Sequence, residues 1–304
     1  MSNLSHTRLQ VFAKTHHLEG LTLPSLQAIN DGLPGYSVDK AQQFLTFQKR
    51  INRDLLRHRI ITSNRYTAWF KRGEQNLEQI KAFIVQFSVF SNQFLVAQLN
   101  KMINADTLES MRASKEILAN EIGVVFKRQS GQAAEDNVYG STEGSVEGSM
   151  FRFKAAHFEW LLAIASKLGL TFHEVGRPKQ GTPATLHFCN ELIRLYGGAN
   201  YKISQAASYA VENWAAAGFW GELIEGFEKF NQRTGRPLPL GFFVWHDQLE
   251  SQHALHTQEE LEEVYFTSGV NEDDFIRYGN EMLDGVAVFW DGLDDERREL
   301  AAVH

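Results

Sequence analysis

Two histidines and a glutamate recur at helical spacing near residue 250. His246, Glu250 and His253 are separated by four and then three residues, so on an α-helix their side chains leave from one stripe. Apolar residues, among them Phe242 and Leu261, accompany that stripe. Burying two imidazoles and a carboxylate there costs roughly several kcal/mol unless a partner satisfies them. A divalent metal ion is such a partner, and the segment therefore predicts a metal-binding helix.

Three further acidic or imidazole side chains lie on apolar stripes of other expected helices. Each recurs at three- and four-residue spacing with aliphatic or aromatic residues, which places it on the buried face of an amphipathic helix. These residues, with the helices expected to carry them, are Glu121 (106–126), His157 (151–168) and Glu212 (204–230).

The combined set holds three carboxylates and three imidazoles, without a thiolate. Such donors suit iron and manganese, whereas structural zinc sites usually include cysteine. Six ligands fit two ions, and about three protein ligands for each ion leave coordination positions open for dioxygen. The residues alone leave one alternative, a buried polar network in which these groups hydrogen-bond one another.

The segments that carry the candidate ligands are all predicted to be helices. Further helical periodicity covers 40–57, 75–104, 184–196 and 272–293, and no convincing strand alternation or repeat is present. The predicted class is all-α, with a single helical bundle. We expect residues 1–74 to form an N-terminal helical extension packed on a bundle that spans 75–304. Residues 127–149, rich in Gly, Ser and acids, are expected to form a loop inserted in the bundle.

Bulk properties exclude several classes of partner. The formal net charge of -7 over 304 residues argues against binding to nucleic acid. A lone Cys189 rules out an internal disulfide framework and fits a reducing compartment. The first twenty residues contain no signal peptide, and we expect no later segment to reach the length of a membrane span. The sequence therefore predicts a cytoplasmic protein that does not bind a membrane.

The order Glu, His, Glu, then His-x3-acid-x2-His resembles the haem-oxygenase-like di-iron oxidase and oxygenase family. Thiaminase II and pyrroloquinoline quinone synthase share the helical bundle of that family. The resemblance covers roughly residues 75–293 and implies a bundle that binds two iron ions, or iron and manganese. Glu250 stands where the family usually has Asp, which keeps the charge and lengthens the side chain. The implied ligands are Glu121, His157, Glu212, His246, Glu250 and His253.

The long separation of Glu121 from His157 resembles the N-oxygenating branch of the family, which adds a carboxylate shortly before the histidine. Glu147 occupies that position, with Glu143 as a second candidate. The sequence leaves open whether Glu147 is a seventh ligand or an ordinary solvated loop residue. The resemblance implies a dioxygen-dependent enzyme that N-oxygenates an amine or amino acid and uses an external electron donor. The chain is compatible with a homodimer.

Three alternative functions remain open at this stage. One is a carbon–carbon cleaving or decarboxylating oxidase of the same family. Another is a metal-free hydrolase of the thiaminase II type with Cys189 as nucleophile, although the surrounding residues supply no visible base for the thiol. The last is a non-catalytic binding protein in which the inward polar groups form a buried network.

Overall fold

Helices dominate the computed structural model, which describes residues 3–126, 151–153 and 156–302. Two short strands, a 3-10 turn and a π-helical segment complete it: β1 (Val124–Phe126), β2 (Phe151–Phe153), η1 (Pro178–Gln180) and η2 (Leu192–Tyr196). The α-helices are α1 (Asn3–His16), α2 (Leu23–Asn30), α3 (Val38–Asp54), α4 (Arg59–Thr62), α5 (Arg65–Phe70), α6 (Leu77–Ile103), α7 (Leu108–Glu121), α8 (His157–Lys167), α9 (Pro183–Glu191), α10 (Tyr201–Ala215), α11 (Phe219–Thr234), α12 (Gly241–Thr267) and α13 (Glu272–Ala302).

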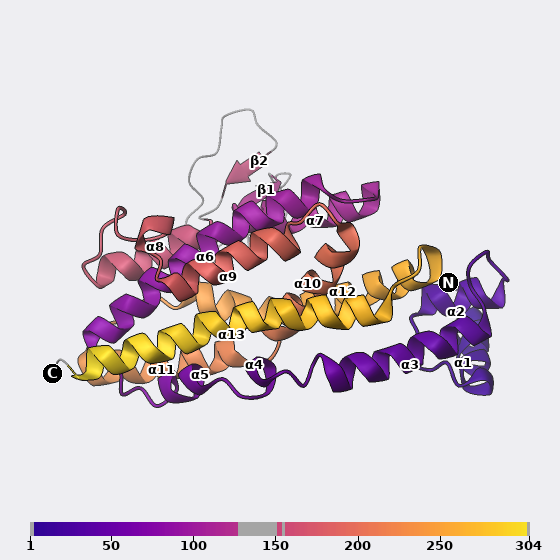
Figure 1. The fold of residues 1–304 in the computed structure, drawn as a ribbon, viewed down its shortest axis with the longest axis horizontal. Coiled ribbons are helices and arrows are strands. Elements are labelled where there is room, and N and C mark those ends of the chain that lie inside the picture. Colours follow the sequence, from indigo (N-terminus) through magenta and orange to yellow (C-terminus); the bar gives the residue numbers. More distant parts are fainter. Residues whose placement is uncertain (1–2, 127–150, 154–155, 303–304) are drawn as a thin grey trace.

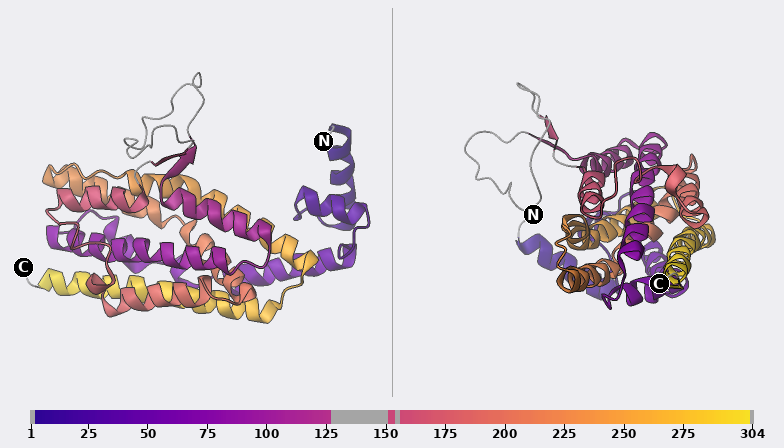
Figure 2. Two further views of the ribbon diagram at one scale, coloured as in Figure 1. Left: turned by 90° about the horizontal axis from the view of Figure 1, so that it is seen from above. Right: turned by 90° about the vertical axis from the view of Figure 1, so that its left-hand side faces the viewer.

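The long helices run side by side along the long axis of the molecule (Figure 1). Helix α13 packs along α9 and α10, while α6 packs against α7, α8, α9 and α13. The first two helices lie at one end of this bundle (Figure 2, left), and α3, α4 and α5 all pack against α13. The predicted all-α class and the helical bundle are therefore confirmed.

Helix α6 supplies the apolar centre of the bundle. Its Phe83 and Phe87 are almost completely buried, and the Phe83 ring lies 5.9 Å from Phe227 of α11 and 6.2 Å from Phe243 of α12. The Phe87 ring lies 6.3 Å from Trp290 of α13. Removing one such buried ring typically costs about 3–5 kcal/mol. These contacts align α11 and α12, which carry residues of the candidate site.

The expectation that no segment reaches membrane-span length is wrong for α6. By length and composition this helix is apolar enough to cross a membrane, and 56% of its apolar window is buried inside the structure. The core helix of a soluble bundle passes the same test, because most of its apolar surface is buried against neighbouring helices. Most of the apolar window of α6 is buried in this way.

A two-stranded ladder interrupts two of the predicted helices. The helix expected over 106–126 ends at Glu121, and the helix expected over 151–168 begins only at His157. Strands β1 and β2 pair antiparallel between these two helix ends, with Val124 opposite Phe153. Both strands consist largely of β-branched or aromatic residues, which favour a pleated surface. The pairing of strands distant in sequence overrides local helical periodicity here.

The single helix expected over 204–230 is also divided in two. Helices α10 and α11 are separated by a turn in which Gly218 has φ of 86°. A residue with a side chain rarely adopts this left-handed conformation, so the glycine permits the chain to change direction. Glu212 remains on α10, while Trp220 belongs to α11.

Gly226 of α11 provides a test of how closely this helix packs on α5. A Cβ atom at Gly226 would lie 2.2 Å from the carbonyl oxygen of Phe70. Because such a contact forces the two helices apart, Gly226→Ala should lower the free energy of unfolding by roughly 1–3 kcal/mol. Urea denaturation followed by circular dichroism measures the change.

Gly221 on the same helix is the matched control. A Cβ atom there would meet only Oδ1 of Asp247, at 3.9 Å. Gly221→Ala should therefore be neutral or stabilise the protein by up to about 1 kcal/mol through helix propensity. Equal effects of the two substitutions would contradict a close α5–α11 contact.

Candidate metal centre

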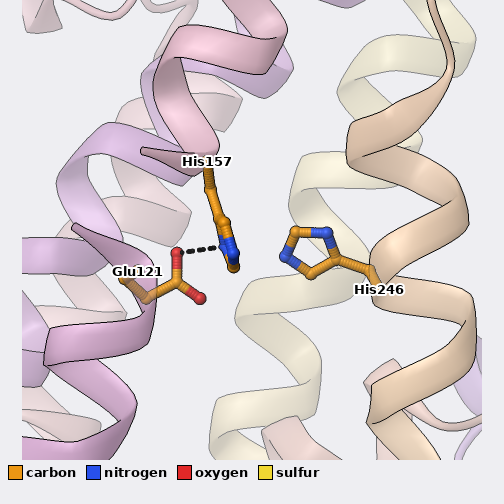
Figure 3. Close-up of side chains that lie close together, drawn as sticks. All are labelled: Glu121, His157 and His246. Atoms are coloured by element: carbon orange, nitrogen blue, oxygen red, sulfur yellow. Dashed lines mark ion pairs between the residues drawn. The ribbon is translucent and has the colours of Figure 1, made fainter. Parts of the chain in front are cut away.

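Three of the predicted ligands, from three different helices, converge inside the bundle. Glu121 is the last residue of α7, His157 is the first residue of α8, and His246 lies in the second turn of α12. Each offers one donor atom, and these atoms all lie within 4.8 Å of one another. Figure 3 shows the two imidazoles and the carboxylate pointing toward a common point.

Glu121 and His157 form the tightest contact of the group. Nδ1 of His157 lies 2.9 Å from Oε2 of Glu121, and the histidine is only 4% exposed. The contact is an ion pair when the imidazole is protonated, but this buried Nδ1 has no hydrogen-bond partner among the described residues. A buried donor atom left in this state is costly. Coordination of a metal ion by the nitrogen and the carboxylate would remove that cost.

The β1–β2 ladder explains why these two residues meet. Strand β1 starts three residues after Glu121, and β2 ends four residues before His157. Antiparallel pairing of Val124 with Phe153 therefore brings the end of α7 beside the start of α8. The backbone N–H of Ala156 donates to Oε1 of Glu159 at 2.9 Å and closes the first turn of α8.

His246 is held in one orientation by its own helix. Its Nδ1 lies 2.7 Å from the carbonyl oxygen of Phe242. A carbonyl can only accept, so Nδ1 carries the proton and Nε2 is left as the metal donor. The ring also stacks on Trp220 of α11 at 4.8 Å, and it lies 4.8 Å from the ring of His157.

A cavity of about 60 Å³ is lined by two of the three residues, Glu121 and His246. This volume holds a few water molecules or small ligands. Its polar wall includes Glu121, Glu212 and His246, and aromatic rings form most of the remainder. The full lining is Phe87, Phe90, Ser91, Phe94, Ile117, Glu121, Val211, Glu212, Trp214, Ala215, Trp220, Phe242 and His246.

The other predicted ligands are not part of the three-residue group, and the side chains of several of them lie outside the described part of the structure. Glu212 is 5% exposed on α10 and lines the same cavity, but it is not part of the three-residue group. Glu250 and His253 lie on α12, one and two turns beyond His246, and their side chains fall outside those that the structure describes. Glu147 and the expected loop 127–149 also lie outside the described residues, as does Glu143.

The donors that are described fit a first-row transition-metal ion. Metal–nitrogen and metal–oxygen bonds of about 2.0–2.2 Å separate neighbouring ligand atoms by roughly 3–4 Å. Donor atoms within 4.8 Å of one another therefore need only small side-chain rotations to share one ion. Two imidazoles and a carboxylate are suitable ligands for iron, manganese or zinc.

Aromatic side chains that were not predicted from the sequence line the site. Trp214 and Trp220 both line the cavity, and Trp220 covers one face of the His246 ring. Trp220 lies at helical spacing with the buried Leu223 and Phe227, so the sequence signals burial. The position of the cavity depends on the turn at Gly218 and cannot be read from periodicity.

Cys189 is poorly suited to act as a nucleophile. It lies on α9 and is 3% exposed, and burial raises the pKa of its thiol to about 12. Catalytic cysteines have a lowered pKa, because the thiolate is the reactive form. The environment of Cys189 thus disfavours the thiaminase II type of hydrolysis.

Comparison with known proteins identifies the fold. No family model matches the chain, and no curated protein matches it in sequence. A domain of unknown function from Shewanella denitrificans OS217, described as having a heme oxygenase-like fold, superposes with a TM-score of 0.54. The identity is 15%, over 86% of this chain and 94% of that one. The chain has a haem oxygenase-like fold.

A CADD-like protein of unknown function from Nostoc punctiforme PCC 73102 gives the same result in two crystal structures. The TM-scores are 0.55 and 0.56, with 16% and 15% identity. The alignments cover 84% and 86% of this chain and 96% and 99% of those chains. At such low identity the likeness concerns the haem oxygenase-like bundle and not its chemistry.

The burial of Cys189 has a measurable consequence. In the native protein at pH 8 its thiol should react with iodoacetamide far more slowly than a free cysteine does, because burial disfavours the thiolate. Unfolding in urea should restore ordinary reactivity. Mass spectrometry of the alkylated protein measures both rates, and fast labelling of the native protein would contradict this environment.

Proposed function

We propose that the chain is a non-haem di-metal oxygenase that uses dioxygen to oxidise a small organic substrate. The observation that carries the proposal is the convergence of Glu121, His157 and His246 donor atoms beside a cavity whose apolar lining is mostly aromatic. The presence of a second carboxylate, the buried Glu212, on the wall of that cavity supports a site with more than one ion.

The ligands divide naturally between two ions. Glu121, His157 and His246 would hold one ion, since their donor atoms already lie together. Glu212, with Glu250 and His253 farther along α12, would hold the second. Iron, or iron with manganese, would supply dioxygen activation in such a site when an external donor provides electrons.

The protein itself contributes geometry and the exclusion of water. The Phe242 carbonyl and the Trp220 ring fix the orientation of His246, so that Nε2 faces the ligand group. The aromatic rings of the cavity limit the water around the site, and a lower local polarity strengthens electrostatic interactions inside it. The small cavity volume of about 60 Å³ favours a small substrate, or one for which side chains must move aside.

We further propose that the oxygen is transferred to the nitrogen of an amine or amino acid. The support is the position of Glu147 relative to His157 in the sequence, which resembles the N-oxygenating branch of the haem-oxygenase-like oxidases. The alternative within the same chemistry is oxidative carbon–carbon cleavage or decarboxylation.

A small-molecule substrate agrees with the net charge of -7, which disfavours nucleic acid. A homodimer and a cytoplasmic location remain predictions from the sequence.

Metal loading tests the proposed site directly. After anaerobic loading with Fe²⁺ and removal of excess metal, the wild-type protein should retain close to two ions per chain. His246→Ala should lose most of that metal, because the substitution removes one of the converging donors. His173 and His187 are exposed, and their Ala substitutions should bind metal normally. Elemental analysis measures the content, and a wild-type protein that binds no metal would instead support the buried polar network.

Product analysis tests the reaction. The iron-loaded protein, supplied with a chemical reductant and dioxygen, should add oxygen to nitrogen in one of a panel of amines and amino acids. Mass spectrometry with ¹⁸O₂ should place the label on that nitrogen. A product with a shortened carbon chain would contradict N-oxygenation and support the cleaving or decarboxylating alternative.

A further inference from the structure

Lys101 of α6 is a buried cation close to the proposed site. Its side chain is almost entirely enclosed, with 6% of the residue exposed. Nζ donates to Oγ of Ser208 at 2.6 Å and lies 4.9 Å from the centre of the Tyr196 ring. Among the described residues no carboxylate forms an ion pair with it. Lysine is rarely buried without an acidic partner, so the charge of Lys101 requires an explanation.

The partners of Lys101 connect it to the helix that carries Glu212. Ser208 lies on α10, one turn before Glu212, so the two side chains leave from the same face of the helix. Both residues are buried. The ammonium group therefore lies within a helical turn of a carboxylate proposed to bind metal, in surroundings that contain little water to screen the interaction.

A second connection leads to the helix that carries Glu121. The Tyr196 hydroxyl donates to Oε1 of Gln98 at 2.5 Å, and Nε2 of Gln98 donates to the carbonyl oxygen of Ser114 at 2.8 Å. Ser114 lies on α7, two turns before Glu121. The polar cluster around Lys101 thus spans α6, α7 and α10, and its last member, Tyr196, ends the π-helical segment η2.

The negative charges of Glu212 and Glu121 affect Tyr196, a member of this polar cluster. Burial is the main cause that raises the pKa of the Tyr196 hydroxyl, and the negative charges of Glu212, Glu260 and Glu121, in decreasing order, add to it. Lys101 stands over the ring of the same tyrosine. The hydrogen bond to Ser208 places the positive charge beside the face of α10 that also carries Glu212.

We propose that Lys101 is the internal counter-charge of the site, and that it sets how tightly the site binds divalent metal ions. The proposal rests on the metal site of the proposed function. In the metal-free protein the ammonium offsets the carboxylates of Glu212 and Glu121. When a divalent ion binds, the ammonium repels it and lowers its affinity. Lys101 touches neither metal nor substrate, and it acts through its charge on the two acids.

Metal affinity provides the first test. Metal-free wild-type protein, Lys101→Met and Lys81→Met are titrated with Mn²⁺ alone by isothermal calorimetry. Lys81 lies on the same helix and its ammonium contacts Glu78 at the surface, at 2.9 Å. Lys101→Met should bind Mn²⁺ more tightly, on the order of tenfold, and Lys81→Met should match the wild type. Unchanged or weaker binding by a folded Lys101→Met protein would overturn the proposal, because it would indicate a purely structural role.

The stability of the metal-free protein provides the second test. Lys101→Met should lower the urea midpoint in the wild-type background, and the loss should largely vanish in the background of Glu212→Gln. A loss of the same size in both backgrounds, or a gain in stability, would overturn the proposal. If Lys101→Met does not fold, Lys101→Gln replaces it in both tests, since the amide can still donate to Ser208.

These two tests separate the two hypotheses. A wild-type protein that binds no Mn²⁺ would contradict the proposed metal site, and the double-mutant cycle would then decide alone whether Lys101 balances the carboxylates. A wild-type protein that binds Mn²⁺, with no coupling between Lys101 and Glu212, would agree with the proposed metal site and contradict the proposed role of Lys101 as its counter-charge.

Discussion

The cost of burying charged donor atoms governs the centre of this protein. Carboxylates and imidazoles inside an apolar bundle lose the hydration that they have in water, and this loss is large unless other groups replace it. The structure brings Glu121, His157 and His246 together and places Glu212 on the wall of the same cavity. Positive charge close to these acids lowers the cost of burying them. A bound metal ion supplies that charge in the proposed function, and Lys101 is placed to supply part of it otherwise.

The surrounding helices hold the residues of this charged centre in fixed positions. The aromatic contacts of α6 with α11, α12 and α13 fix the helices from which Trp220 and His246 extend. Donor atoms must be held to within a fraction of an ångström to bind a metal selectively, and side chains on packed helices achieve this better than side chains on loops. The short β1–β2 ladder plays the same part for Glu121 and His157, which lie at helix ends.

The fold is supported by similarity to solved structures, whereas the proposed function is supported by the geometry of the site. The similarity to solved haem oxygenase-like structures extends over most of the chain, and it accounts for the bundle. One fold can carry unrelated chemistries, so the functional argument depends on the site alone. The site argues for metal through its donor types and their convergence, and against a nucleophilic cysteine through the burial of Cys189.

Local sequence pattern determined the helices and which of their faces are buried. The helix expected over 75–104 corresponds closely to α6, and the metal-binding helix expected near residue 250 corresponds to α12. The inward placement of His157 and Glu212 follows from helical periodicity. Apolar spacing suffices for these features because a helix forms from contacts between residues three and four apart.

Only the tertiary structure decided where those faces meet. The β1–β2 pairing joins segments that are distant along the chain, and the turn at Gly218 divides a continuous apolar pattern into α10 and α11. Neither feature has a periodicity to reveal it. The same holds for Lys101, which continues the buried stripe of α6 after Phe94 and Gln98, but whose neighbour Ser208 comes from another helix. The sequence by itself therefore determined the donors and their helices. Their convergence, and the charge beside them, depend on contacts between residues far apart in the chain.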